Sequence, residues 1–309
     1  MSILGIDRIT YGVEDVAKCR KFFLDWGLKL ARESGDALDF ETQNGCEIHV
    51  RSATHPALPP AIEPGSTLRE VVWGVASQAD IERLRKSLGT EGRYAERTGA
   101  LHTTDPNGLA LVFRVTQKRK VDVKGVPINA WGQPGRGVNL RSTFYERAEP
   151  IEVGHVVFFT DRLADAERFY VDKLGFAVSD RYPGRGVFLR CAPEGGHHDL
   201  FLLQPPVAKR GLNHVAFAVR DIHEVFGGGL HISRCGWDTE LGPCRHPISS
   251  AYFWYVKNPA GGLIEYYTDE DQLDGAWQPR EFQQSTEAFA EWAVVGGIDG
   301  KSRRAKTAP

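Results

Sequence analysis

The chain of 309 residues is longer than one ordinary domain, so we expect two compact units that each bury a core. Its 25% charged residues give a net charge of −2, which excludes the strongly basic composition of many nucleic-acid-binding proteins. No segment approaches the roughly 18 consecutive apolar residues of a membrane span. Residues 1–12 lack the basic and apolar regions of a signal peptide. We therefore expect a cytoplasmic protein that binds neither nucleic acid nor membrane.

The cysteines show no pattern of a bridged or metal-bound framework. Their number is odd, they are scattered, and none forms a C-x-x-C spacing: Cys19, Cys46, Cys191, Cys235 and Cys244. This favours free thiols over a disulfide framework or a zinc ribbon.

A strand followed by a helix occurs in similar form in both halves of the chain. Residues 6–13 and 153–160 read as short strands, and each leads into an amphipathic helical pattern. Gly27 and Gly175 follow the two helical patterns as C-cap signals. The sequence therefore predicts one βα unit that is used twice.

A second pair of segments repeats this arrangement. Residues 68–75 and 212–219 read as strands, and helical stretches follow them at 79–88 and 220–229. Each repeat closes with a turn, Asp105–Gly108 or Asn258–Gly261, in which proline fixes φ and glycine supplies a positive φ. These turns are expected to join the strands of a hairpin.

The repeats predict four modules of a strand, a helix and further strands, at about 4–60, 66–117, 150–206 and 210–270. Paired, they give an N-terminal domain at 1–125 and a C-terminal domain at 150–270, joined by a Gly/Pro-containing linker at 126–149. The extension 271–309 has one amphipathic stretch at 285–297 and a polar, basic end. We expect this extension to pack on the surface and then to fray.

One polar residue stands on an apolar strand face at three matching places: His155, His214 and Glu265. Residues two apart share a face of a strand, and the neighbours at that spacing are mostly apolar. A lone histidine of this kind is more often a hydrogen-bonded core residue, but three at corresponding module positions favour a metal site. Two imidazoles and one carboxylate form the facial triad suited to non-haem Fe(II). Mn(II) is the alternative, because nitrogen and oxygen ligands bind both metals.

The N-terminal half provides an internal control for this hypothesis. At the positions that match the three candidate ligands it has Arg8, Glu70 and Val112, which cannot assemble two imidazoles and a carboxylate. Seven of the ten histidines also lie in the C-terminal half. The sequence therefore predicts that catalysis belongs to the C-terminal domain.

The fourth module ends in a distinctive motif. It reads Cys244-Arg245-His246, an eight-residue spacer, and then Tyr255-Val256-Lys257-Asn258-Pro259-Ala260-Gly261-Gly262-Leu263-Ile264-Glu265. Together with the four modules, this motif resembles the vicinal oxygen chelate superfamily and, within it, the type I two-domain extradiol dioxygenases. Cys244 replaces the family's usual glycine and Trp254 its usual aliphatic residue, which indicates a divergent branch.

The resemblance implies an α+β fold of four βαβββ modules paired into two domains, each an incomplete β-barrel with helices outside. In that family two histidines and a glutamate from the third and fourth modules hold the metal, and these positions correspond to His155, His214 and Glu265. The implied activity is Fe(II)-dependent extradiol (meta) cleavage of a catechol-type aromatic diol by O2. The family also implies a homo-oligomer.

Three further roles follow from the resemblance. His198 matches the family's acid/base histidine beside the metal and would take the second catechol proton; His197 is the alternative, because a one-residue shift reverses which of the pair points inward. Tyr255 would hydrogen-bond a substrate oxygen, or else is an ordinary core aromatic. His246 matches a substrate-side histidine on a loop that closes the pocket, where a histidine is otherwise simply solvated.

Other activities of the superfamily are the competing hypotheses. The same triad supports hydroquinone cleavage, and the relatives include isomerases and thiol transferases that use other metals and no oxygen. The confinement of the candidate ligands to one domain, together with His198, His246 and Tyr255, favours dioxygenation. A purely ligand-binding role, as in the drug-sequestering members, is disfavoured because those proteins typically lack the metal residues.

Overall fold

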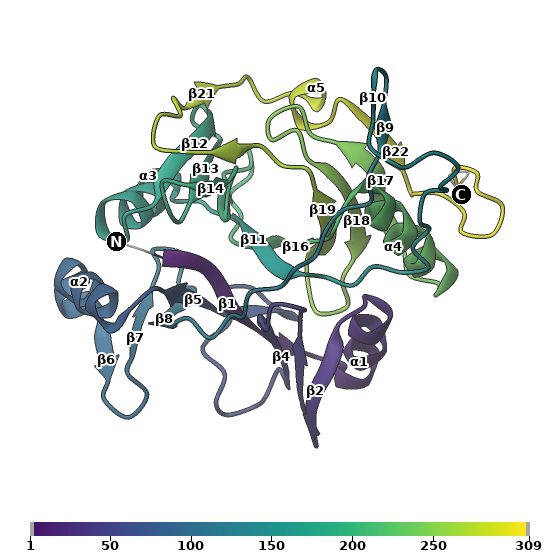
Figure 1. Cartoon of the computed structure of the whole chain (residues 1–309). Helices are drawn as coiled ribbons and strands as arrows, with labels where there is room; N and C mark the ends of the chain where they lie inside the picture. Colours follow the sequence, from purple (N-terminus) through teal and green to yellow (C-terminus); the bar gives the residue numbers. More distant parts are fainter. Residues whose placement is uncertain (1–2, 307–309) are drawn as a thin grey trace.

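The computed structural model describes residues 3–306, which form two large mixed sheets (Figure 1). The N-terminal sheet lies below the C-terminal sheet in this view, with α1 and α2 flanking the lower sheet and α3 and α4 flanking the upper one. No helix within residues 3–306 is both long and apolar enough to cross a membrane.

The N-terminal sheet has eight strands in the order β2-β3-β4-β1-β5-β8-β7-β6 and contains the first two modules. Strands β1 and β5 pair antiparallel where the modules meet, and each is parallel to the last strand of its own module. The elements are β1 (Ile3–Val13), α1 (Val16–Asp25), β2 (Lys29–Ser34), β3 (Ala37–Glu41), β4 (Glu47–Ser52), β5 (Thr67–Val75), α2 (Gln78–Leu88), a 3-10 turn (Gly89–Glu91), β6 (Arg93–Ala95), β7 (Ala100–Thr104) and β8 (Ala110–Val115).

The C-terminal sheet has ten strands in the order β21-β12-β13-β15-β11-β16-β19-β18-β17-β22. Strands β11 and β16 pair antiparallel at its centre and are parallel to β15 and β19. The elements of its two modules are β11 (Glu152–Phe159), α3 (Leu163–Arg168), a π-helical turn (Phe169–Lys173), β12 (Ala177–Tyr182), β13 (Gly186–Arg190), β14 (Gly195–Gly196), β15 (Leu200–Leu203), β16 (Gly211–Ala218), α4 (Ile222–Arg234), β17 (Thr239–Arg245), β18 (Tyr252–Lys257) and β19 (Leu263–Thr268).

The order of strand, helix and three main strands occurs four times, which confirms the predicted α+β fold of βαβββ modules. Local sequence signals account for much of this fold. Gly27 and Gly175 have φ values of 94° and 80° just after helical segments, as expected of C-cap glycines. Gly108 and Gly261 have φ values of 94° and 111° in the turns that precede β8 and β19.

The two sheets share a continuous hydrophobic core. Trp26, which follows α1, stacks on Tyr266 of β19 with ring centroids 3.5 Å apart, and the Tyr266 hydroxyl donates to the backbone carbonyl of Trp26. The Trp237 indole donates to Asp25 at 2.7 Å. These contacts hold the first module against the fourth. The domain boundaries near 125 and 150 stay a prediction.

The linker carries a small hairpin and exposed apolar side chains. Its strands are β9 (Asn129–Ala130) and β10 (Gln133–Pro134). Large apolar side chains in and beside the hairpin face solvent: Ile128, Trp131, Val138, Leu140 and Phe144. This surface is available for contacts with another molecule.

The C-terminal extension joins both edges of the C-terminal sheet rather than only covering its surface (Figure 1). After β20 (Gln272–Leu273), strand β21 (Arg280–Glu281) pairs with β12 and strand β22 (Trp292–Val295) pairs with β17, with the short helix α5 (Thr286–Phe289) between them. Strands of two and four residues are too short to show an alternating pattern of apolar and polar residues in the sequence. They lie where they pair with sheet edges that would otherwise be unpaired. Fraying was predicted for the polar, basic end at 301–309, and of these residues 307–309 lie outside the described ones.

Helix α4 contains three consecutive glycines, which are normally unfavourable inside a helix. In α4 the missing side chains allow the helix to pack closely against its neighbours. A Cβ atom added to Gly229 would lie 2.1 Å from the Trp254 ring, so the bare backbone lets the helix approach the indole on β18. Trp254 is fully buried and donates its indole N–H to Thr239 at 2.9 Å. The helix thereby covers the outer side of the strands that carry the fourth module.

We predict that Gly229→Ala destabilises the protein by about 1–3 kcal/mol, because the added methyl group would overlap Trp254. In an open helix the same change would be stabilising. Urea unfolding followed by circular dichroism measures the difference. Gly275→Ala is the control, since an added Cβ there meets nothing within 4 Å. A Gly229→Ala protein as stable as the parent would contradict the close packing.

Candidate metal centre

His155, His214 and Glu265 lie on one face of three adjacent strands. Ala216 of β16 pairs with His155 of β11 on one side and with Glu265 of β19 on the other. His214 precedes Ala216 by two residues, so its side chain emerges on the same face. Strand register alone therefore brings together three side chains that are far apart in the sequence.

The three donor groups are close together and buried. The Nε2 atoms of His155 and His214 are 3.3 Å apart, and Oε2 of Glu265 lies 3.1 Å from each of them. The three residues are 4%, 6% and 1% exposed. Ligands at right angles around an ion, with bonds of about 2.0–2.2 Å, would have donor atoms about 3 Å apart. The residues present therefore fit a metal ion in both donor chemistry and spacing.

The surroundings hold these groups in the protonation states that metal binding requires. Burial opposes ionisation of Glu265, but hydrogen bonds with His155 and His214 lower its pKa to about 2. Burial lowers the pKa of His155, although the Glu265 carboxylate acts in the opposite direction. At neutral pH the pair is thus a carboxylate and a neutral imidazole, which are the ligand forms of both side chains.

The N-terminal sheet repeats this register with different residues. Val72 of β5 pairs with Arg8 of β1 and with Val112 of β8, and Glu70 precedes Val72 by two residues. The predicted correspondence of Arg8, Glu70 and Val112 with the three candidate ligands thus agrees with the strand pairing. Here Arg8 donates to Glu70 at 3.1 Å. An ion pair stands where the C-terminal sheet has a cluster of metal-binding groups.

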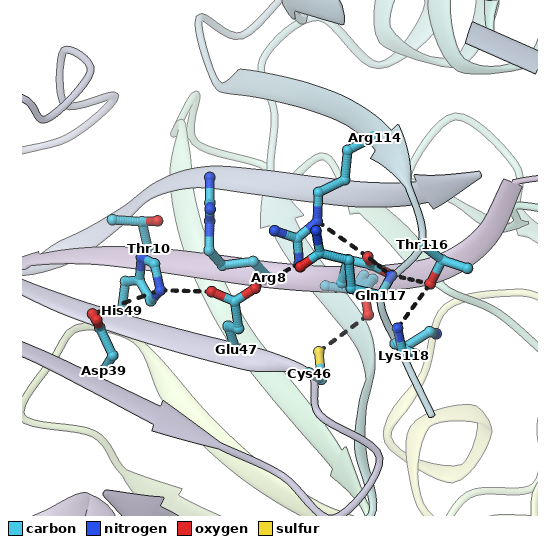
Figure 2. Close-up of polar contacts among 12 residues, drawn as sticks. Arg8, Thr10, Asp39, Cys46, Glu47, His49, Arg114, Thr116, Gln117 and Lys118 are labelled. Carbon is cyan, nitrogen blue, oxygen red and sulfur yellow. Dashed lines mark hydrogen bonds and ion pairs between the residues drawn. The ribbon is translucent and has the colours of Figure 1, made fainter. Parts of the chain in front are cut away.

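Charged groups continue from this ion pair along the N-terminal sheet (Figure 2). Glu47 accepts a hydrogen bond from Arg114 at 2.6 Å and lies 2.9 Å from His49 Nε2. Arg114 also donates to the fully buried Asp7. Burial acts against ionisation of Glu47, yet the contacts with His49 and Arg114 lower its pKa to about 2. The paired charges indicate a structural role for this half.

The structure separates the two adjacent histidines that the sequence left as alternatives. His198 lines a cavity over the candidate ligands, with its ring centroid 4.2 Å from that of His155. His197 is fully buried and lies 3.0 Å from Asp180 through Nε2. Burial, and then the neighbouring histidines, lower the pKa of His198 well below its usual value. His198 is therefore the member of the pair that faces the candidate metal site, as a neutral imidazole.

Tyr255 and His246 lie at the same cavity. Tyr255 pairs with Glu265 across β18 and β19, and its hydroxyl is 3.4 Å from His246 Nε2. His246 follows β17 directly, and its Nδ1–H donates to the carbonyl of Phe289 at 2.6 Å. Burial lowers the pKa of His246 to about 4. The structure thus brings all six predicted site residues together; their chemical roles stay predictions.

The cavity has a volume of about 500 Å³ and mostly apolar walls. Phe188 and Phe201 stack on each other in its wall with ring centroids 3.9 Å apart. Other apolar lining residues are Val157, Tyr182, Leu203, Leu241, Ile248, Leu263, Ala288, Phe289 and Val295. Among the described residues that line it there is no lysine or arginine, and Glu240 is the one carboxylic acid.

One wall of the cavity comes from the C-terminal extension, which the sequence did not predict. Five residues of that segment line the cavity: Gln284, Ser285, Ala288, Phe289 and Val295. Four of them lie in the amphipathic stretch at 285–297, and Ser285 begins α5 as an N-cap whose hydroxyl accepts from the Ala288 N–H. The stretch was expected to pack on the surface, and nothing in its pattern indicated that it would line a cavity.

Comparison with known proteins gives the same family as the motif. Residues 152–266 match the family model of the Glyoxalase/Bleomycin resistance protein/Dioxygenase superfamily. Metapyrocatechase 2 of Cupriavidus necator is 31% identical over 295 residues, which cover 94% of this chain and 89% of that protein. A manganese-dependent 2,3-dihydroxybiphenyl 1,2-dioxygenase of Geobacillus genomosp. 3 is 23% identical, over 85% of this chain and 84% of the relative.

The fold agrees with these relatives. The Mn(II)-bound glyoxalase from Novosphingobium aromaticivorans superposes with a TM-score of 0.74 over 99% of this chain and 95% of that one, at 22% identity. The chain belongs to the glyoxalase/bleomycin resistance/dioxygenase superfamily. Its sequence relatives named here are extradiol ring-cleaving catechol dioxygenases, so the family predicted from the sequence is confirmed.

We predict that His214→Ala reduces bound metal from about one ion per chain to almost none, because two donors cannot replace a facial set of three. Metal analysis of protein purified under anaerobic conditions measures the loss. Arg8→Ala, at the N-terminal counterpart of His155, is the matched control and should keep its metal. Full metal content in His214→Ala would remove this residue from the ligand set.

Proposed function

We propose that the protein is an extradiol dioxygenase that opens the ring of a catechol next to its two hydroxyl groups. The observation that carries the proposal is the buried set of two imidazoles and a carboxylate under an apolar cavity. The similarity to metapyrocatechase 2 along most of the chain supports it. Both atoms of O2 enter the product of such a reaction, so it requires no external reductant.

His155, His214 and Glu265 would hold the metal, which we propose to be Fe(II), with Mn(II) as the alternative that one relative's name indicates. Three protein donors would leave such an ion able to take further ligands from a substrate. When bound, the metal supplies a Lewis acid that favours ionised catechol and a path for electrons from the ring to oxygen.

The residues around the triad would handle protons and orient the ring. His198, held neutral by burial, would accept the second catechol proton. The hydrogen bond from His246 Nδ1 to the Phe289 carbonyl leaves Nε2 to accept from the substrate or from Tyr255. The Tyr255 hydroxyl would donate to a catechol oxygen. The apolar walls would exclude water from the reacting ring.

The cavity walls favour a catechol with an uncharged, apolar substituent. The volume of about 500 Å³ lies within the ordinary range for small-molecule sites. Without a lysine or arginine among the described lining residues, a carboxylate on the substrate would be buried unpaired, which costs several kcal/mol. Aromatic and aliphatic walls would instead accommodate an aryl or alkyl group.

Hydroquinone cleavage and non-oxidative chemistry of the superfamily are the alternatives. The structural neighbour named as a glyoxalase is 22% identical, a similarity that concerns the fold alone. Oxygen consumption separates these activities, because isomerases and thiol transferases use none.

We further propose that the protein acts in the cytoplasm as a homo-oligomer on small diffusible diols. The exposed apolar side chains of the linker, Trp131 and Phe144 among them, are the feature that supports a contact between copies.

We predict a kcat/KM at least about 100-fold higher for 2,3-dihydroxybiphenyl than for 3,4-dihydroxyphenylacetate, because the latter carries an unpaired carboxylate. Oxygen uptake together with the appearance of the coloured ring-opened product measures both. Ala288→Arg should narrow this ratio by placing a cation in the cavity wall, whereas Thr286→Arg, outside the wall, should not. A parent protein that prefers the carboxylated substrate would contradict the proposed specificity.

We predict that His198→Phe retains its metal but lowers kcat by about 10²–10⁴-fold, because a general base is lost while the three ligands remain. Metal analysis and steady-state oxygen uptake on one preparation test both parts. An unchanged kcat would assign the proton transfer to another residue.

A further inference from the structure

A chain of hydrogen bonds, buried from Asp180 inward, connects the C-terminal extension to His198. Arg280 of β21 donates to Asp180 of β12 through Nη2 at 2.7 Å and through its backbone N–H at 2.8 Å. Asp180 lies 3.0 Å from His197 Nε2, and His197 Nδ1 lies 3.1 Å from His198 Nδ1. Asp180 and His197 are both fully buried. None of these three residues lines the cavity, so none of them would contact a bound substrate directly.

The direction of each hydrogen bond follows from the first member of the chain. The ion pair with Arg280 keeps Asp180 ionised, and a carboxylate only accepts hydrogen bonds. His197 must therefore donate its Nε2–H to Asp180. A neutral imidazole has one donor and one acceptor nitrogen, so His197 Nδ1 accepts. The proton between the two histidines then belongs to His198 Nδ1.

The direction of the hydrogen bond between the two histidines rests on His197 carrying a single ring proton. Asp180 is fully buried and contacts both Arg280 and His197, whereas the Arg280 side chain is 42% exposed and also lies 4.0 Å from Asp271. Glu270 contacts the backbone N–H of His197 rather than its ring, and burial raises the pKa of Glu270 to about 8. Asp180 is therefore the carboxyl group that contacts the His197 ring.

We propose that Asp180 and His197 are positioning residues that fix His198 in the tautomer with the proton on Nδ1 and the lone pair on Nε2. Among the described residues, Nδ1 makes the one side-chain hydrogen bond of His198, and Nε2 is the nitrogen that remains for the cavity. A lone pair on Nε2 is what a base needs to accept a catechol proton. The catalytic meaning of this arrangement rests on the proposed function, but the tautomer itself does not.

Arg280 also has a second contact, which links the extension to the cavity wall. Besides Asp180, Arg280 donates to the backbone carbonyl of Ile248, which lines the cavity. Docking of β21 therefore completes the ion pair that orients His197 and fixes one cavity wall at the same time. The extension would be required for proton transfer as well as for closing the pocket.

Nitrogen NMR of the full chain, labelled with ¹⁵N-histidine and loaded with diamagnetic zinc, tests the tautomer directly. The His198 signals are identified by their absence from His198→Phe. We expect a protonated Nδ1 and an unprotonated Nε2 for His198 in the parent protein. A protonated Nε2 would overturn the proposal.

Two substitutions at His197 separate positioning from mere packing. Gln can accept from His198 through Oε1 and donate to Asp180 through Nε2, whereas Leu can do neither. We expect His197→Leu to mix the His198 tautomers and to lower kcat with catechol by about 10–100-fold with a smaller change in KM, and His197→Gln to restore both properties in large part. Equal effects of Leu and Gln would overturn the positioning role.

The control is His231→Leu, which removes a partly buried histidine of α4 and should leave the His198 signals and kcat unchanged. If the expected tautomer is found but no catechol is turned over, the proposed function fails and the hydrogen-bond chain stands. If catechols are cleaved but Nε2 of His198 is protonated, the proposed function stands and the proposed tautomer fails.

Discussion

The site depends on the register of three strands. Ala216 pairs with His155 on one side and Glu265 on the other, and His214 lies two residues away on the same face. A slip of one residue in either pairing would turn a donor away from the cluster. The surrounding apolar core resists such a slip, because it would also expose the buried residues on the opposite face of each strand. The fold therefore positions the candidate ligands through the same packing that stabilises the sheet.

The duplicated architecture shows how one framework serves two purposes. The N-terminal sheet has the same register around Val72, but Arg8 and Glu70 form an ion pair there. A buried charge is tolerated when it has a partner, and in this half the partners are other side chains. In the C-terminal half the donor set lacks a cationic side chain to balance Glu265, and a metal ion would supply that charge. The difference between the halves is thus one of charge compensation.

Sequence reasoning succeeded where a signal is repeated or local. The four modules, their C-cap glycines and the two turns with proline and glycine were predicted because each pattern recurs in the chain. The candidate ligands were found by comparing matching positions of the modules. The extension was expected to pack on the surface, but its pairing with both sheet edges and its part in the cavity wall were not predicted, because strands as short as β21 have no detectable period. Asp180 and Arg280 were missed since their pairing joins residues 100 positions apart.

The extension has a larger part in the site than its composition suggests. It contributes Ala288 and Phe289 to the cavity wall and Arg280 to the hydrogen-bond chain behind His198. Its strands pair with both edges of the C-terminal sheet, so β12 and β17 gain partners on their otherwise unpaired sides. Binding of substrate and transfer of its proton would thus depend on a segment outside the four modules.

The most direct test of dioxygenase activity is the fate of labelled oxygen. The metal-loaded protein would be mixed with 2,3-dihydroxybiphenyl under ¹⁸O₂, and the ring-opened product analysed by mass spectrometry. Our account predicts a product that contains oxygen from O2, with ¹⁸O₂ as the source of both added atoms before exchange with water. A converted substrate without label, or conversion that proceeds equally well without O2, would contradict it.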